Sequence, residues 1–534
     1  MQHRTFRNIA YYFAFGLLTL FLFSPIVLKF CTNSWDENGL TFIRPLLICS
    51  AIVSSCLLVK HRGLSIIVLT IFAFTTICEW VMVSNYGSYM DIDLFIAFAT
   101  TNWEEGTHFA INNLHALWYV IPILLLFVVL CILYVCSVLP ALRVRFITWV
   151  ICISVAIVGM MPIEKISSMH HISDIKIAVF KHAFTTPPLN MFHLTKITIR
   201  QLQRRQQVNN FTFHSHRTEE SPNKEIYVLA IGESMRYANC SLNGIYARET
   251  MPQLAQHSNL LYYSDYYASG CTTSTSVPMI ITRATAEDNA LSYQERSIIQ
   301  VFQENGFTTA VVQRGLFAQP SSTYLYQGVD ITRYARTDAE VIQHVDKLTK
   351  EHDKLFVMFQ LRGSHFYYDN FPPEFNTFRP NNIYDQEVVS DSLLINAYDN
   401  TILYTDHLLS TMIDSLKTLQ ATSAVWYVSD HGQTITATQG WHGTVCDENE
   451  YHVPFFIWYS DWYGNANADV ISCLQNNLNV PINSDNIFYT ICGMTHIQLP
   501  NQYAHPTWDI SSPVFTPHSR NLLVGGRVVG LDEQ

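Results

Sequence analysis

We predict a chain of two parts, a membrane domain of five transmembrane helices followed by an α/β domain with a mostly parallel central sheet. Long apolar runs dominate residues 1–165, and each approaches the ~20 apolar residues that cross a bilayer. From residue 225 onward, short apolar strands alternate with helices, a pattern typical of parallel sheets covered on both faces. Polar residues follow several of these strands, at the sheet edge where such folds bind ligands.

The expected membrane spans are residues 9–29, 43–59, 64–84, 116–138 and 147–163. Arg and Lys lie before the first span, between the second and third, and between the fourth and fifth, whereas acidic residues occupy the other loops. The positive-inside rule then places the N-terminus in the cytoplasm and residues after 165 on the opposite side, the periplasm of a bacterium. The first span is long and others follow, so we interpret it as a retained helix rather than a signal peptide.

We expect the membrane domain to be residues 1–165, a connector to be 166–222, and a catalytic domain to be 223–534. A helix lying on the membrane surface is predicted over 186–207, with a solvated linker as the alternative. The net charge of −11 argues against nucleic-acid binding. The second domain contains five of the 12 cysteines without a CxxC pair, which excludes a zinc finger and leaves any disulfide pairing open.

The expected elements of the α/β domain follow the apolar runs and their boundaries. Strands are predicted at residues 225–231, 309–313, 354–360, 424–429 and 453–459. Helices are predicted near 251–256, at an apolar stretch around 279–281, and as a long amphipathic segment over 387–418.

Three metal-competent side chains follow two of these strands. Glu233 follows the first strand closely, and Asp430 and His431 come directly after the strand that ends at residue 429. Carboxylates and an imidazole at one sheet edge are suited to holding a transition metal. For Glu233 alone, a place near a helix N-terminus is an equally good interpretation.

A hydroxyl-rich run, residues 269–278, precedes the apolar helix. Hydroxyls at a helix N-terminus lie near free N–H groups and the positive end of the dipole, which favour an alkoxide or a phosphoryl oxygen. Ordinary capping by Ser or Thr is the alternative.

The order of short motifs along the second half is similar to a known family. Gly232-Glu233-Ser234-Met235-Arg236, with the segments after it, resembles the GE(S/T)xR…SLxGY…TxP signature of phosphoethanolamine transferases, in the alkaline phosphatase/sulfatase superfamily. The further matching segments are residues 241–244, 250–252, 276–278, 363–365, 396–400, 429–432, 453–455 and 485–488. The resemblance extends to the five membrane spans, and it implies an alkaline phosphatase/sulfatase-like fold for the α/β domain.

The resemblance implies a Zn²⁺ site in which one ligand is also the nucleophile. Carried over residue by residue, the metal ligands are Glu233, Thr273, Asp430 and His431. Because the loop differs in length from the familiar form, the nucleophile stays open between Thr273, which we prefer, and Thr272.

The resemblance also implies residues that contact substrate. His365 and His442 match positions where the family places histidines near the phosphoryl group, and we expect catalytic and substrate-binding roles for both; His452 is a weaker match. Asn102 and Glu105 lie in a loop that resembles one thought to approach the lipid donor, although a solvated acidic loop is as good an interpretation.

Together these matches imply transfer of phosphoethanolamine from phosphatidylethanolamine, through a phospho-threonine, to lipid A or another lipopolysaccharide phosphate or sugar. We expect a monomer in the bacterial inner membrane. The alternatives are glycerophosphate transfer on the same scaffold and an inactive membrane scaffold or sensor. A formylglycine sulfatase is disfavoured because neither Pro nor Arg follows Cys271 at the required positions. Ala238 and Asn239 stand where many members have Asp-His, so any role of that histidine is absent.

Overall fold

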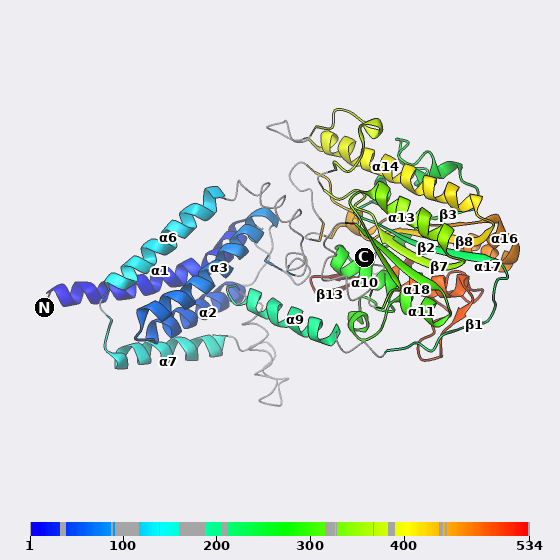
Figure 1. Cartoon of the computed structure of the whole chain (residues 1–534). Coiled ribbons are helices and arrows are strands. Elements are labelled where there is room, and N and C mark those ends of the chain that lie inside the picture. Colours follow the sequence, from blue (N-terminus) through cyan, green and yellow to red (C-terminus); the bar gives the residue numbers. More distant parts are fainter. Residues whose placement is uncertain are drawn as a thin grey trace. The chain divides into compact units, whose positions relative to one another are not determined.

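The structure is a computed structural model that divides into two compact units, Met1–Arg200 and Gln201–Gln534 (Figure 1). It describes residues 2–32, 39–86, 89–90, 95, 117–137, 139–159, 187–205, 211–314, 326, 328–366, 368–382, 390–436, 442–443 and 446–531.

The first unit is helical. Helices at the five predicted spans are α1 (Gln2–Thr32), α2 (Gly39–Leu58), α3 (Arg62–Tyr86), α6 (Leu117–Cys136) and α7 (Leu142–Gly159). Within the described residues, three stretches are long and apolar enough to cross a bilayer, namely Tyr11–Cys31, Arg62–Ser84 and Trp118–Cys136. The apolar part of α2 is shorter, and α7 has 18 residues with two arginines in its first turn, so the count of five spans stays a prediction.

The helix predicted over 186–207 is present as α9 (Asn190–Arg205). Its first residue, Asn190, donates from Nδ2 to the Glu79 Oε1 atom of α3 at 2.9 Å and to the Met90 carbonyl at 2.6 Å. Both Asn190 and Glu79 are buried, which joins the start of α9 to α3 through satisfied polar groups. Whether α9 lies on a membrane surface stays a prediction.

The second unit contains a seven-stranded sheet in the order β3-β9-β8-β2-β7-β5-β6. The strands are β2 (Lys224–Gly232), β3 (Leu260–Tyr263), β5 (Thr308–Arg314), β6 (Ile331–Ala335), β7 (Lys354–Gln360), β8 (Ala421–Ser429) and β9 (Phe455–Tyr459). The strands β8, β2, β7, β5 and β6 are parallel, but β9 is antiparallel to β8 and to β3. The sheet is therefore mixed, because four of its six strand pairs are parallel and the two pairs made by β9 are antiparallel. The chain leaves β8 and enters β9 at the same edge of the sheet, so the two strands run antiparallel, a pairing that needs no crossover helix. In the described part of this connection, the helix is the single turn α15 (Glu448–Tyr451).

Both faces of the sheet are buried, because alternate residues of β2 belong to two different cores. Tyr227, Leu229 and Ile231 pack in one core together with residues of α10 (Thr273–Ile281), α11 (Ile298–Glu304) and α18 (Ser484–Met494). Ile226, Val228 and Ala230 pack in the other core with α13 (Asp338–Glu351) and α14 (Asp391–Thr418). Figure 1 shows these helices on opposite sides of the strands.

Two predicted helices need adjustment. The segment near 251–256 forms only a 3-10 turn, Leu254–Gln256, and the Asp406 carboxylate of α14 accepts hydrogen bonds from the N–H groups of Gln253 and Leu254. The long helix begins at Asp391, where the Ser390 side chain accepts a hydrogen bond from the Leu393 N–H.

The remaining elements are short. They are β1 (His216–Arg217) paired with β11 (Ile497–Gln498), β4 (Tyr266–Tyr267) paired with β10 (Ile482–Asn483), the hairpin of β12 (Asn521–Val524) and β13 (Arg527–Gly530), α16 (Asp461–Ala466) and α17 (Ala468–Asn476).

Candidate metal centre and nucleophile

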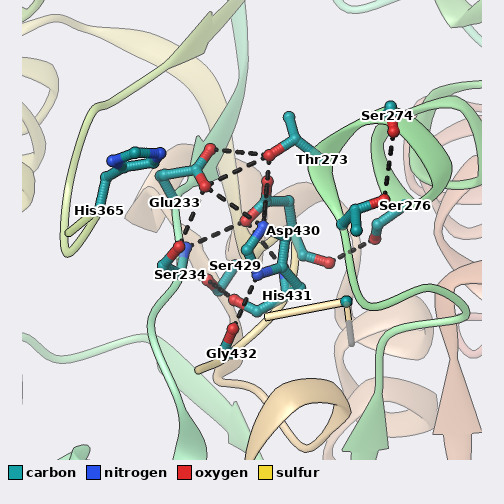
Figure 2. A network of polar contacts seen from close by, with 12 residues as sticks. Glu233, Ser234, Thr273, Ser274, Ser276, His365, Ser429, Asp430, His431 and Gly432 are labelled. Carbon is teal, nitrogen blue, oxygen red and sulfur yellow. Dashed lines mark hydrogen bonds and ion pairs between the residues drawn. The ribbon is translucent and has the colours of Figure 1, made fainter. Parts of the chain in front are cut away.

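The predicted metal ligands converge at the ends of two adjacent parallel strands. Strand β2 pairs with β8 in a register that sets Gly232 opposite Ser429. The next residues, Glu233 and Asp430, therefore leave the same edge of the sheet side by side, followed by His431 (Figure 2). The two strands come from segments about 200 residues apart, and the parallel pairing is what brings the ligands together.

The polar atoms of these residues form one compact cluster. The ligand atoms of Glu233, Asp430 and His431 all lie within 4.8 Å of one another. His431 Nε2 is 3.3 Å from Glu233 Oε1 and 3.6 Å from Asp430 Oδ2. The Thr273 hydroxyl lies 3.1 Å from Glu233 Oε2 and 3.3 Å from His431 Nε2. The four predicted ligands are thus brought together.

The orientation of the cluster is fixed by its neighbours. His431 Nδ1 lies 2.7 Å from the Gly432 carbonyl, which can only accept, so Nδ1 carries the proton and Nε2 faces the cluster. Ser234 donates from its N–H to Asp430 Oδ1 at 3.1 Å and from its hydroxyl to Glu233 Oε1 at 3.0 Å. It does so with φ of 60°, an uncommon conformation for a non-glycine residue.

Burial and mutual charge shift the pKa values in the cluster. Burial raises the pKa of Asp430, and the nearby Glu233 carboxylate raises it further. Burial would also raise the pKa of Glu233, but its hydrogen bond to His431 and the charge of that imidazole hold it below its ordinary value. Burial would lower the pKa of His431, but the two carboxylates outweigh burial and raise this pKa above its ordinary value. Two carboxylates sharing one imidazole leave an excess of buried negative charge, which a cation would neutralise.

The donor set fits a transition-metal ion. Asp430 is fully buried, and its Oδ2 atom has no hydrogen-bond partner within the described residues, although buried polar atoms are normally satisfied. Two carboxylates, an imidazole whose Nε2 faces the cluster and a hydroxyl are suitable ligands for Zn²⁺.

A second group, Cys271, Cys446 and Glu450, also has atoms close enough to hold a metal. Its two cysteines are joined in a disulfide, so their thiols are not available as ligands. This bond is the pairing that the sequence left open, and it also removes Cys271 as a formylglycine precursor in this structure.

The hydroxyl-rich run behaves differently from ordinary capping. Helix α10 begins at Thr273, and the side chain of the preceding N-cap residue, Thr272, accepts no capping hydrogen bond. The Thr272 hydroxyl instead lies 2.8 Å from the hydroxyl of Thr275 and 3.2 Å from that of Ser274. Of the two threonines proposed as nucleophile, Thr273 is the one with a hydroxyl in contact with the cluster, and Figure 2 shows Ser274 pointing away from it.

Two of the predicted histidines lie next to the predicted metal ligands. The ring of His442 stacks on His431 with centroids 4.1 Å apart, and the ring of His365 lies 6.3 Å from His442. Burial and the charge of His431 hold the pKa of His442 well below its ordinary value, so this imidazole is neutral. In Figure 2, His365 lies beside Glu233.

Of the remaining predicted positions, the one that the structure describes, His452, lies away from this cluster. His452 stacks on Tyr237 at 3.9 Å and lies 3.3 Å from the Ser264 carbonyl, which explains it as a packing residue. Asn102 and Glu105 lie outside the described residues.

Two residues of the site were missed from the sequence. Gln360, the last residue of β7, donates from Nε2 to Glu233 Oε2 at 3.0 Å. The sequence could have indicated Gln360, because it is a polar residue at the end of an apolar strand that neighbours β2. The second is Ser234, whose positive φ has no signature in sequence.

The profile of the sulfatase family matches residues 225–497. Kdo(2)-lipid A phosphoethanolamine 7''-transferase of Escherichia coli K12 is 29% identical over 295 residues, 50% of each chain. Phosphoethanolamine transferase EptA of Salmonella typhimurium is 27% identical over 321 residues, 54% of this chain and 56% of that protein. The matched region therefore spans about half the length of these curated relatives.

Solved structures share the fold. The integral membrane lipooligosaccharide phosphoethanolamine transferase A of Neisseria meningitidis superposes with a TM-score of 0.71 at 17% identity, covering 93% of this chain and 97% of that one. The C-terminal periplasmic domain of EptC from Escherichia coli, in complex with Zn, superposes with a TM-score of 0.53 at 21% identity, covering 60% and 95%.

Proposed function

We propose that this chain, a member of the sulfatase family, transfers phosphoethanolamine from phosphatidylethanolamine to lipid A or another lipopolysaccharide phosphate or sugar. The proposal is supported by its similarity to phosphoethanolamine transferases. The family resemblance drawn from the motifs is confirmed, whereas donor, acceptor and metal belong to the proposal. The protein would be a monomer of the bacterial inner membrane, with residues 1–165 holding five spans, 166–222 a connector, and 223–534 a catalytic domain in the periplasm.

The observation that carries the proposal is the position of the Thr273 hydroxyl. It lies within 3.3 Å of both Glu233 and His431, at the first residue of helix α10. The first N–H groups of a helix have no intrahelical acceptor, and they can receive a phosphoryl oxygen. A hydroxyl nucleophile and donors for the oxygens of its target therefore occur at one place.

Glu233, Asp430, His431 and Thr273 would hold the metal. Zinc bound there would supply a positive charge that polarises a phosphoryl oxygen and lowers the pKa of the Thr273 hydroxyl. Thr273 Oγ1 would then attack phosphorus in line, and the bond from phosphorus to the diacylglycerol oxygen would break. The product on the protein is a phosphoethanolamine ester of Thr273.

His365 and His442 are the groups available for proton transfer near the leaving oxygen. His442 would accept a proton from the incoming acceptor oxygen, and His365 would protonate the departing diacylglycerol. Attack of the acceptor oxygen on phosphorus would break the ester and restore the Thr273 hydroxyl. Asn102 and Glu105 would contact the lipid donor.

The nucleophile is tested by comparing Thr273→Ala with Thr272→Ala in the full chain, measuring release of diacylglycerol from a fluorescent phosphatidylethanolamine. We expect Thr273→Ala to lower the rate by ~10³-fold or more, and Thr272→Ala, which keeps the nucleophile, by far less. The reverse pattern would assign the attack to Thr272. Equal turnover in both variants and the wild type would reject Thr272 and Thr273 as the nucleophile.

Two further measurements separate the alternatives. Competition between phosphatidylethanolamine and phosphatidylglycerol as donors distinguishes phosphoethanolamine from glycerophosphate transfer. Zinc analysis of the purified chain and of Asp430→Asn distinguishes an enzyme from an inactive scaffold, because a scaffold would hold no zinc in either form. Mass spectrometry of envelope lipids from cells with and without the chain would identify the acceptor.

A further inference from the structure

Two buried carboxylates outside the metal cluster have the same arrangement. Asp338 and Glu450 each accept hydrogen bonds from two backbone N–H groups of a segment that carries one of the site histidines. The segments are the His365 loop, residues 361–366, and the His442 segment, of which His442, Gly443 and Cys446 are described. Neither carboxylate is needed by the transfer reaction as proposed above.

Asp338 is the first residue of α13, and its side chain is fully buried. Its Oδ1 atom accepts from the Arg362 N–H at 3.0 Å, and its Oδ2 atom accepts from the Gly363 N–H at 3.1 Å. Asn370 Nδ2 also donates to Oδ2, at 2.6 Å, and Arg314 Nε lies 2.9 Å from Oδ1. Both oxygens are therefore occupied by N–H donors.

The His365 loop is in turn in contact with the metal cluster. The Ser364 N–H donates to the Glu233 carbonyl at 3.0 Å. Gly363 has φ of +48°, and a Cβ added there would lie 3.1 Å from the Glu233 carbonyl oxygen. A loop this close to Glu233 has little freedom, and Asp338 holds its backbone from the side of α13.

Glu450 has the corresponding position for His442. Its Oε2 atom accepts from the N–H groups of Gly443 at 2.7 Å and Cys446 at 3.2 Å, and its Oε1 atom accepts from the Thr434 hydroxyl at 3.0 Å. Its own carbonyl accepts from the Gly432 N–H at 2.7 Å, next to His431. Glu450 is fully buried and joins the His442 segment to the chain that follows His431.

We propose that Asp338 and Glu450 are positioning residues that set the places of His365 and His442 relative to the metal cluster. A carboxylate can accept several N–H donors at once, which fixes a loop that has no regular secondary structure. Displacing a catalytic group by ~1 Å can cost ~10²-fold in rate, so fixing these loops matters for a two-step transfer. The inference rests on the proposed function for its rate effect.

The test compares Asp338→Asn with a matched control, Asp406→Asn, in the full chain. Asp406 is also fully buried and also accepts from two N–H groups, those of Gln253 at 2.9 Å and Leu254 at 2.8 Å, in a turn without a predicted site residue. In both residues each carboxylate oxygen accepts from a different backbone N–H group. The amide N–H₂ of Asn, in either orientation, therefore faces one backbone N–H group as donor against donor, and each variant loses one backbone hydrogen bond.

Glu450 allows a test by rescue. In Glu450→Gln the amide oxygen can replace Oε2 and keep both backbone N–H donors, while the N–H₂ group donates to the Thr434 hydroxyl. Glu450→Ala removes all three contacts. We therefore expect Gln to retain the wild-type place of His442 and Ala to lose it.

The first readout is the rate at which diethyl pyrocarbonate modifies each histidine, resolved by mass spectrometry. Asp338→Asn should raise the rate at His365 and leave His442 at the wild-type rate, and Glu450→Ala should do the opposite. The second readout is release of diacylglycerol, in which Asp338→Asn and Glu450→Ala should lose ~10-fold or more in kcat with a smaller change in KM. Asp406→Asn and Glu450→Gln should match the wild type in both.

Equal modification rates in Asp338→Asn, Asp406→Asn and wild type would overturn the role of Asp338, and the same result for Glu450→Ala and Glu450→Gln would overturn that of Glu450. If the wild type releases no diacylglycerol, the proposed function fails, but the histidine modification pattern still decides positioning. A general loss of structure would raise the modification rates of both histidines together, contradicting the proposal.

Discussion

Replacing Gly443 with Ala should disturb the site through the contact between the His442 segment and the start of α10. Gly443 has φ of +81°, and an added Cβ would lie within 3.0 Å of Thr272 Cγ2, closer than real Cβ atoms approach. The segment cannot move away easily, because the Gly443 N–H is bound to the Glu450 carboxylate at 2.7 Å. We therefore expect two separate costs, one from the backbone and one from the overlap.

The two costs can be estimated separately. A left-handed backbone costs an L-residue ~1–2 kcal/mol. Overpacking at a buried contact costs ~1–3 kcal/mol, and Thr272 is buried. Thr272→Ser removes Cγ2 but keeps the hydroxyl that contacts Thr275, at the cost of ~0.8 kcal/mol for the lost methyl group.

The assay is a double-mutant cycle on Gly443→Ala and Thr272→Ser, with the unfolding midpoint followed by tryptophan fluorescence in one detergent. Gly443→Ala alone should lower the midpoint by several degrees, since ~1 kcal/mol corresponds to roughly 2 °C in a large unit. Adding Thr272→Ser should recover the overlap part, a coupling of ~1–3 kcal/mol. A neutral Gly443→Ala, or additive effects of the two changes, would refute the reasoning.

Three further predictions concern the same part of the unit. Gly432→Ala should destabilise by ~3 kcal/mol, because its Cβ would lie within 3.0 Å of the Asn449 carbonyl oxygen, and denaturant midpoints would check this. Burial raises the pKa of Glu450 from its ordinary 4.5 to about 7. Between these two pH values the folded protein keeps the proton while the unfolded chain loses it. The stability of the wild type should therefore fall by up to ~3 kcal/mol relative to Glu450→Gln as the pH rises from 4.5 to 7, and the difference should stay constant above pH 7. Parallel curves of stability against pH for the two proteins would contradict this. Reductant should lower the melting temperature of the wild type, because breaking the Cys271–Cys446 bond costs ~2–5 kcal/mol of stability. The melting temperature of a variant with both cysteines replaced by Ser should not change with reductant, and equal sensitivity of the two proteins would exclude this disulfide as the cause.

Much of the candidate metal centre could be predicted because its proposed ligands have a local signature. Glu233 and Asp430 each follow an apolar strand closely, and both strands were predicted from their composition. The preference for one candidate nucleophile required more than the pattern, because Thr272 and Thr273 are adjacent in a run of hydroxyls. Only the start of α10 at Thr273 turns one hydroxyl toward Glu233 and the other toward Thr275.

The features that could not be predicted depend on contacts between distant segments. Cys271 and Cys446 are separated by 175 residues, and no spacing rule pairs them. Asp338 looks like an ordinary acidic residue in the first turn of a helix, and its role depends on a loop 24 residues away. The reversed direction of β9 depends on which edge of the sheet the chain re-enters, which an apolar run of residues does not record.

The pairing of β2 with β8 has a consequence for how the sheet is assembled. A slip of one residue in the Gly232–Ser429 register would move one ligand ~3.3 Å along the strand and exchange the two faces of that strand. Glu233 and Asp430 would then no longer meet, and an ion could not bind both. An ion that needs both carboxylates would stabilise only the correctly paired strands. Metal binding during folding would therefore favour molecules whose two central strands are correctly aligned.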